Sequence, residues 1–175
     1  MDTSKSEKMA EAFLAKDRPF KRKVRITEQV FEASPAEVFK QLCPTREMDW
    51  IDGWTADLVY TETGYIEQDC IFTTPTENII GSGLWIITRL EPDELLELVR
   101  IIDNNLVIHF RIELDDNGNG TSTGIWTLKF TALNEMGNTI LEAMPDEDPI
   151  FDKVVSGLGH FLKTGHLMRI TETTA

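Results

Sequence analysis

The chain has few of the features that mark a secreted, metal-binding or membrane protein. Among its 175 residues are two cysteines, Cys43 and Cys70, and three histidines, too few for a disulfide framework or a zinc module. No apolar run approaches the ~20 residues that span a bilayer, and residues 1–16 are charged throughout, with no signal-peptide core. These absences predict a cytoplasmic, single-domain protein whose core forms without disulfides, structural metals or cofactors.

Positive charge is scarce outside the N-terminus. The chain holds 17 Lys and Arg against 30 Asp and Glu, and residues 1–25 contain eight of the basic side chains but only four of the acidic ones. The acidic remainder repels nucleic-acid phosphate and anionic lipid, so we expect no nucleic-acid partner. Lys21, Arg22, Lys23 and Arg25 form the one basic cluster, which we interpret as a solvated strand edge, with an anionic partner as the alternative.

Capping signals predict the helices. Ser4 and Glu7 begin a helix over residues 4–17, which we expect to belong to an N-terminal helical appendage, residues 1–20, outside the main domain, residues 21–170. Ser34-Pro35-Ala36-Glu37 combines an N-cap serine, a first-turn proline and a capping-box glutamate. This second helix should end near Cys43, before Pro44, and a short turn should follow over residues 45–50.

The last helix has an equally clear start. Asp148 can cap it with Pro149 at its first position, and a wide apolar stripe continues to about Gly165. Two glycines, Gly157 and Gly159, interrupt this helix. They leave space for a ligand beneath it, allow a neighbouring strand to approach closely or let the helix bend, and we keep these interpretations open.

Alternating apolar residues predict a meander of strands between these helices. The expected strands cover residues 23–32, 58–62, 68–74, 83–90, 95–102, 106–114 and 126–130. In the last two strands the apolar positions are even-numbered, so a three-residue loop, Asn117–Asn119, would place both sets on one face with Phe110 opposite Trp126. A bulge is the alternative.

The order of elements is that of an α+β fold. One strand, two short helices, an antiparallel meander and a long C-terminal helix require a curved sheet of about six or seven strands that wraps on that helix. No repeat and no second domain are visible in the sequence.

Three segments resemble a known superfamily. Residues 30–39 (VFEASPAEVF), 85–95 (WIITRLEPDEL) and 124–130 (GIWTLKF), in this order of elements, resemble the START-like helix-grip superfamily, also called SRPBCC. It includes lipid-transfer domains, pathogenesis-related allergens, polyketide cyclase-like proteins and chaperone activators. The resemblance covers residues 22–165 and implies a hydrophobic cavity between the sheet and the long helix, with dimerisation in some members.

Large apolar side chains are the best candidates for the wall of such a cavity, although core packing explains most of them equally well. Trp50 and Trp54 flank the short helices, which in the resembled fold lie near the cavity mouth. The full candidate set is Trp50, Trp54, Trp85, Phe110, Trp126, Leu128, Phe130, Gly157, Leu158 and Phe161.

The polar residues offer weaker candidates. His109, Arg111 and Glu113 would suit acid–base chemistry, but the alternation places them on the convex face of the sheet, where a surface cluster is expected. His160 and His166 lie about 240° apart on a helix and cannot jointly hold a metal. The acidic stretch that includes Glu142, Asp146, Glu147, Asp148 and Asp152 suits a helix N-terminus, so we assign no metal site.

We therefore expect the chain to bind a small hydrophobic, amphipathic or lipid-like molecule between sheet and helix, with a homodimer possible and no membrane span. The first alternative is a polyketide cyclase-like enzyme, whose acid or base would be sought first among Asp49, Asp57 and Glu28. The second is a protein-interaction module of the chaperone-activator type, working through the outside of the sheet or the N-terminal helix.

Overall fold

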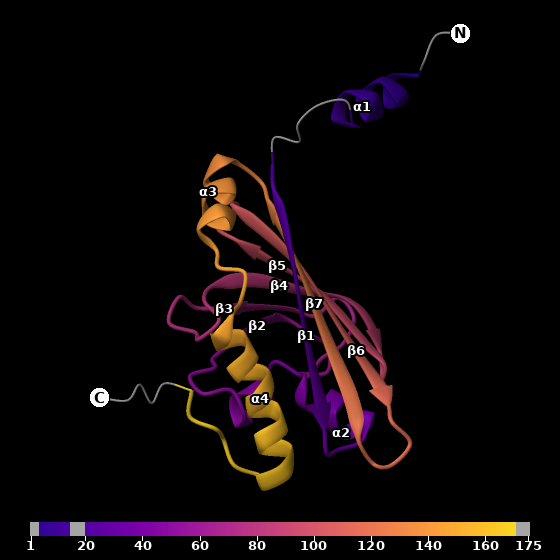
Figure 1. Ribbon diagram of the computed structural model, residues 1–175, viewed down its shortest axis with the longest axis vertical. Coiled ribbons are helices and arrows are strands. Elements are labelled where there is room, and N and C mark those ends of the chain that lie inside the picture. Colours follow the sequence, from indigo (N-terminus) through magenta and orange to yellow (C-terminus); the bar gives the residue numbers. More distant parts are fainter. Residues whose placement is uncertain (1–3, 15–19, 171–175) are drawn as a thin grey trace.

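The computed structural model describes residues 4–14 and 20–170 of the chain (Figure 1). Seven antiparallel strands form one curved sheet in the order β1-β7-β6-β5-β4-β3-β2. The strands are β1 (Arg22–Phe31), β2 (Asp57–Tyr60), β3 (Ile71–Thr74), β4 (Gly83–Glu91), β5 (Leu95–Ile102), β6 (Leu106–Asp116) and β7 (Ser122–Ala132). The predicted α+β helix-grip arrangement is confirmed.

The helices follow the capping signals closely. They are α1 (Lys5–Leu14), α2 (Pro35–Gln41), the 3-10 helix η1 (Glu47–Asp49), α3 (Glu135–Ala143) and α4 (Pro149–Thr164). Residues 15–17 of the expected first helix and Pro19 lie outside the described residues. None of the helices that the structure describes is long and apolar enough to cross a membrane.

The predicted caps of α2 and α4 form as expected. The Ser34 backbone N–H donates to the Glu37 carboxylate at 2.9 Å, while the Ser34 side chain accepts from the Glu37 backbone N–H. At α4 the Asp148 side chain accepts from the Phe151 N–H at 3.1 Å, and Gly165 ends the helix with φ of 70°. These ends could be read from sequence because a cap depends only on residues within one turn.

The register of β6 and β7 differs from the prediction by two residues. Phe110 lies opposite Leu128, and Trp126 lies opposite Ile112, so the expected pairing of Phe110 with Trp126 is wrong. The turn is centred on Asn119, because Gly118 and Gly120 both take positive φ, 77° and 81°. A shift of two residues preserves the face, so the even-numbered apolar residues of both strands are buried on the concave side.

Helix α3 was not predicted from the sequence. Its N-cap is Asn134, whose side chain accepts from the Gly137 N–H at 2.9 Å. Gly137 is required because a Cβ there would lie 2.2 Å from the Asn105 carbonyl oxygen. α3 therefore sits tightly against β7 and the turn before β6, and it covers one end of the concave face (Figure 1).

Helix α4 covers the rest of the concave face, alongside β1 and next to α2 (Figure 1). Its buried residues Val154, Val155 and Leu158 join the apolar side chains of the sheet in one core cluster. The core thus lies between the curved sheet, α4 and the segment that contains α2 and η1, and any ligand space must be found there.

Candidate ligand-binding site

Two hollows adjoin each other on the concave side of the sheet. The inner cavity lies between β3–β7, the α2–η1 segment and α4, and its volume is about 60 Å³. The groove lies between β5–β7, α3 and the start of α4, and its volume is about 560 Å³. Ile80, Phe110 and Phe151 line both hollows, so they are neighbours that share a wall. Only the groove is within the ~300–1,000 Å³ range of small-molecule pockets.

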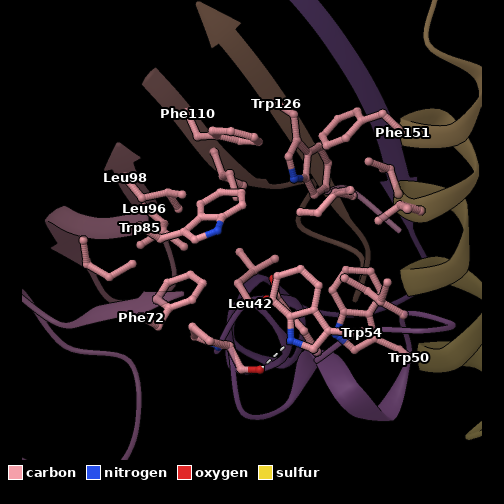
Figure 2. Close-up of a pocket in the computed structure, with 18 residues that line it drawn as sticks. Leu42, Trp50, Trp54, Phe72, Trp85, Leu96, Leu98, Phe110, Trp126 and Phe151 are labelled. Carbon is pink, nitrogen blue, oxygen red and sulfur yellow. Dashed lines mark hydrogen bonds between the residues drawn. The ribbon is translucent and has the colours of Figure 1, made fainter. Parts of the chain in front are cut away.

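Seven aromatic side chains line the inner cavity. They converge from the sheet, from the α2–η1 segment and from α4 (Figure 2). Phe72 stacks on Trp85 with ring centres 5.5 Å apart, and Trp85 packs against Phe110 at 5.3 Å. The aromatic members are Trp50, Trp54, Phe72, Trp85, Phe110, Trp126 and Phe151. Because these rings fill the space themselves, the cavity has little room left.

Three of the four tryptophans are fixed by hydrogen bonds. The indole N–H groups of Trp50 and Trp54 donate to backbone carbonyls at 2.9 and 2.8 Å, and Trp85 donates to Thr74 Oγ1 at 3.0 Å. Trp126 Nε1 has no hydrogen-bond partner within the described part of the chain, and its ring packs over Gly124, where a Cβ would lie 2.5 Å from Cζ3. Trp126 therefore supplies an N–H that faces the cavity without a protein acceptor.

Glu47 is an acid that the sequence analysis missed. It begins η1 and lines the inner cavity beside Leu42, Trp50 and Trp54. The residue is partly exposed, but protein atoms surround its carboxyl group, and this burial raises the pKa to about 8 from the usual 4.5. Among the residues described, its carboxylate has neither a hydrogen-bond donor nor a cation beside it. Such a carboxyl group can hold or release a proton near neutral pH.

The groove has a different wall. Most of its lining is aliphatic and comes from β5–β7, from α3 and from the segment between α3 and α4. Phe110, Leu128 and Phe130 are the candidates from the sequence analysis that line it. The other apolar members are Ile79, Ile80, Ile102, Leu106, Ile108, Ile140, Met144, Pro145, Pro149, Ile150 and Phe151.

Two arginines give the groove its polar groups on the sheet side. Arg25 of β1 forms an ion pair with Asp148 at 2.8 Å, and its guanidinium lies 5.5 Å from the centre of the Phe130 ring. Arg100 of β5 is 5% exposed and points to the concave face, in line with Leu98. A buried arginine in a mostly apolar groove is an unusual placement, because burial disfavours the charged form.

The basic cluster of β1 contacts acidic residues of the same chain. Lys21 pairs with Glu142, and Lys23 pairs with Asp146 at 3.0 Å. Together with the Arg25–Asp148 pair, these contacts tie β1 and the residue before it to α3 and to the segment between α3 and α4. The basic cluster and the acidic stretch thus neutralise each other along one rim of the groove.

Three of the candidate residues line neither hollow. Gly157 is buried beside Trp50, where an added Cβ would lie 3.6 Å from the Trp50 carbonyl oxygen. Leu158 is fully buried in the core, and Phe161 packs against the core from its edge. Gly159 faces Phe31 of β1, with an added Cβ 3.7 Å away. In this structure both glycines face protein atoms at ordinary contact distance.

Of the polar candidates, Glu147 and Asp148 line the groove, and the others lie outside both hollows. His109, Arg111 and Glu113 are on the convex face, where Arg111 pairs with Glu113 at 2.7 Å and with Glu97. Asp49, Asp57 and Glu28 are all exposed. His160 and His166 are exposed too, while Cys43 and Cys70 are buried thiols. Within residues 4–14 and 20–170 no three His, Cys, Asp or Glu side chains gather as metal ligands would.

The sequence carries no clear signal for Arg100 or Glu47. In the segment Leu95–Ile102 the even-numbered and the odd-numbered positions each have three apolar residues and one charged residue, so alternation does not decide whether Arg100 or Glu97 is buried. Glu47 lies in η1, which is too short for a periodic pattern, and its burial depends on how the segment folds against the sheet.

Sequence comparisons find no match: no family model matches the chain, and no curated protein does. Solved structures do match in shape. Truncated norcoclaurine synthase from Thalictrum flavum has a TM-score of 0.63 at 11% identity over 86% of this chain and 99% of that one. Ara h 8.0201 has a TM-score of 0.58 at 9% identity, covering 82% and 99%. CalU16 from Micromonospora echinospora has a TM-score of 0.53 at 15% identity, covering 83% and 87%.

These three proteins have the same curved sheet and long C-terminal helix over nearly their whole length, although fewer than one residue in six is identical. Likeness at this level is evidence about the fold and leaves ligand and reaction to be argued from the site. The chain therefore has the helix-grip fold that these structures share, which is the fold implied by its sequence resemblance to the START-like superfamily.

Proposed function

We propose that the protein binds a small hydrophobic or amphipathic molecule in the groove between β5–β7 and the α3–α4 segment. The observation that carries this proposal is a 560 Å³ hollow with a largely apolar wall that adjoins the core cavity. A ligand that buries its carbon there gains roughly 25 cal/mol for each Å² removed from water. Norcoclaurine synthase, which has this fold, has been solved with dopamine and hydroxybenzaldehyde, so the fold can hold small aromatic molecules.

The binding unit that we propose is residues 21–170, with residues 1–20 as an appendage. The described side chains of α1 are exposed and line neither the inner cavity nor the groove. A chain that begins at residue 21 should therefore bind the same ligand with the same affinity, which a side-by-side titration of the two chains would measure.

The proposal is tested with a neutral fluorescent probe, N-phenyl-1-naphthylamine, whose emission rises in apolar surroundings. The full chain should bind it, and Met144→Trp should weaken binding at least tenfold because Met144 lines the groove and a larger ring would fill it. Met136→Trp is the matched control, since Met136 is 59% exposed on the same helix and lines neither hollow. Absence of binding, or equal loss in both variants, would contradict the proposal.

A second function is supported by Glu47. A carboxyl group with a pKa of about 8 beside an apolar hollow can act as a general acid or base, as a cyclase-type enzyme would require. Trp126, which lines the same cavity, offers an N–H that can stabilise negative charge on an oxygen. The groove would then hold the substrate beside the cavity that Glu47 lines, because Phe110 and Phe151 line both hollows.

Binding and catalysis can be separated by what happens to the bound molecule. Native mass spectrometry followed by denaturing extraction would identify the compound that the purified protein retains. This compound is then incubated with the chain and its mass followed by chromatography. An enzyme should convert it, Glu47→Gln should abolish conversion while keeping probe binding, and Asp49→Asn, an exposed acid of the same short helix, should change neither. A compound that remains unchanged would contradict catalysis.

A further inference from the structure

Arg100 is the most buried charged residue that lines the groove. It lies near the end of β5, opposite Trp85 on one side and Ile108 on the other, and is 5% exposed. Its guanidinium carbon lies 4.8 Å from the centre of the Trp85 ring, a cation–π contact that holds the group flat against the aromatic wall. The cation therefore sits at the border between the groove and the inner cavity.

The hydrogen bonds of Arg100 use only part of the guanidinium. Nε donates to the Ser82 carbonyl at 3.2 Å, and Nη2 donates to the Ile80 and Ser82 carbonyls at 2.7 and 2.6 Å. These bonds fix the orientation of the side chain, and Gly83 leaves the space for it, since a Cβ there would lie 2.7 Å from Nε. An arginine has five N–H donors, so the two on Nη1 have no acceptor among the residues that the structure describes.

The charge of Arg100 is also without a counter-ion in that part of the chain. Carbonyl oxygens orient a cation but do not cancel its charge, and no carboxylate lies within ion-pair distance. Burial lowers the pKa of Arg100 to about 10, so the group stays charged at neutral pH. Arg25, in the same groove, has Asp148 as a partner, and Arg111, on the convex face, has Glu97 and Glu113.

The remaining anionic groups of the groove are placed at its outer rim. Glu147 and Asp148 line it from the segment before α4, where Glu147 is exposed and Asp148 is already paired with Arg25. Solvent screens charges at the rim far more than charges at the floor. A ligand that enters the groove thus meets an apolar wall and, deeper, one buried cation with two free donors.

We propose that the ligand of this groove is an anion, with an apolar body along β5–β7 and one carboxylate directed at Nη1 of Arg100. This inference rests on the proposed binding function and narrows it to hydrophobic carboxylates. A carboxylate supplies oxygen acceptors for the two N–H donors of Nη1, and its negative charge provides the counter-ion that the buried guanidinium lacks. An alcohol or an ester of the same carbon skeleton supplies an acceptor but no charge.

The test compares two probes of equal length, decanoate and decan-1-ol, as competitors of bound N-phenyl-1-naphthylamine at pH 7.5. Decanoate should displace the neutral probe from the full chain at a concentration at least tenfold below that of decan-1-ol. Equal potency of the two competitors, with the neutral probe bound, would overturn the anion inference and leave hydrophobic binding intact. Failure of all three compounds to bind would overturn the binding function itself.

Variants assign the effect to Arg100. Arg100→Met should raise the decanoate concentration needed for displacement about ten- to a hundredfold and leave decan-1-ol unchanged, while Arg100→Lys, which keeps the charge, should retain part of the preference. Arg89→Met is the control, because it removes the same charge from an exposed site outside the groove. Should Arg100→Met unfold, Arg100→Lys is compared with Arg89→Met instead. A reduced preference for decanoate in Arg100→Lys, with an unchanged preference in Arg89→Met, supports the assignment to Arg100. An unchanged preference in Arg100→Lys, or an equal loss in both variants, would overturn it.

Discussion

The inner cavity and the groove lie on the same side of one sheet, but they differ in the side chains that line them and in the volume that these side chains leave open. The inner cavity collects all four tryptophans of the chain and retains about 60 Å³. The groove contains no tryptophan, has mainly aliphatic walls and leaves about 560 Å³. Aromatic side chains here mark the region where the fold is closed, because large rings fill space, and the ligand space lies where smaller side chains leave it open.

The tighter packing of the inner cavity can be tested by removing one of its aromatic rings. Trp85→Ala should lower the free energy of unfolding by about 3–5 kcal/mol, because Trp85 is buried, stacks on Phe72 and hydrogen-bonds Thr74. Urea unfolding followed by circular dichroism measures the loss. Ile140→Ala, in the half-buried wall of the groove, is the comparison and should cost much less. Similar losses in the two variants would mean that the inner cavity is no better packed than the groove.

Glu47 lines the inner cavity but not the groove, and it should make the stability of the protein depend on pH. Its pKa of about 8 in the folded protein lies above the usual 4.5, so between these values the folded protein holds a proton that the unfolded chain has released. Stability should therefore fall as the pH rises from 4.5 to about 8, by up to ~1.4 kcal/mol per pH unit. Glu47→Gln should match the wild type at pH 4 and exceed it in stability at pH 8.

Unfolding curves at pH 4, 6 and 8 check this expectation, with Asp49→Asn as the exposed control from the same short helix. If the difference between Glu47→Gln and the wild type were the same at all three pH values, the carboxyl group would not be buried as described, and the case for acid–base chemistry would fall with it.

The smallest expected effect concerns the glycines of α4. Gly157→Ala should stabilise the protein by about 0.5–1 kcal/mol, because alanine favours the helix and its Cβ would meet Trp50 at an ordinary 3.6 Å. Affinity for N-phenyl-1-naphthylamine should stay unchanged, since Gly157 lines neither hollow. A Gly157→Ala variant that is more stable but binds the probe more weakly would instead show that this glycine keeps space open for the ligand.

The two regions also differ in how far sequence could predict them. Helix starts at Ser34 and Asp148 were predictable because the caps involve neighbouring residues. The face of β6 and β7 was predictable from alternation, but the pairing was not, because two glycines with positive φ lengthened the turn. The tryptophans were proposed as wall residues from their size, with the resemblance as a further reason for Trp50 and Trp54 and the strand alternation for Trp126.

The volume left between side chains could not be predicted. This volume is the small difference between the space that the backbone encloses and the volume of the side-chain atoms that fill it. It depends on packing between elements that are distant in sequence. Helix α3 illustrates this: its nine residues show only a short pattern, yet they form one wall of the groove. Alternation in β5 does not show which of its faces is buried, and the missing counter-ion of Arg100 is a property of the folded chain alone.

The pairing of β1 with β7 determines how early during synthesis of the chain the binding site can form. Arg22 lies opposite Thr131, so the first strand of the domain finds its partner only after the rest of the sheet has been synthesised. Closing so long a loop favours slow folding, and α3 and α4, which complete the groove, follow β7 in the chain. A nascent chain that ends before α4 thus has neither a complete groove nor the Arg25–Asp148 bridge, and ligand can stabilise only the finished protein.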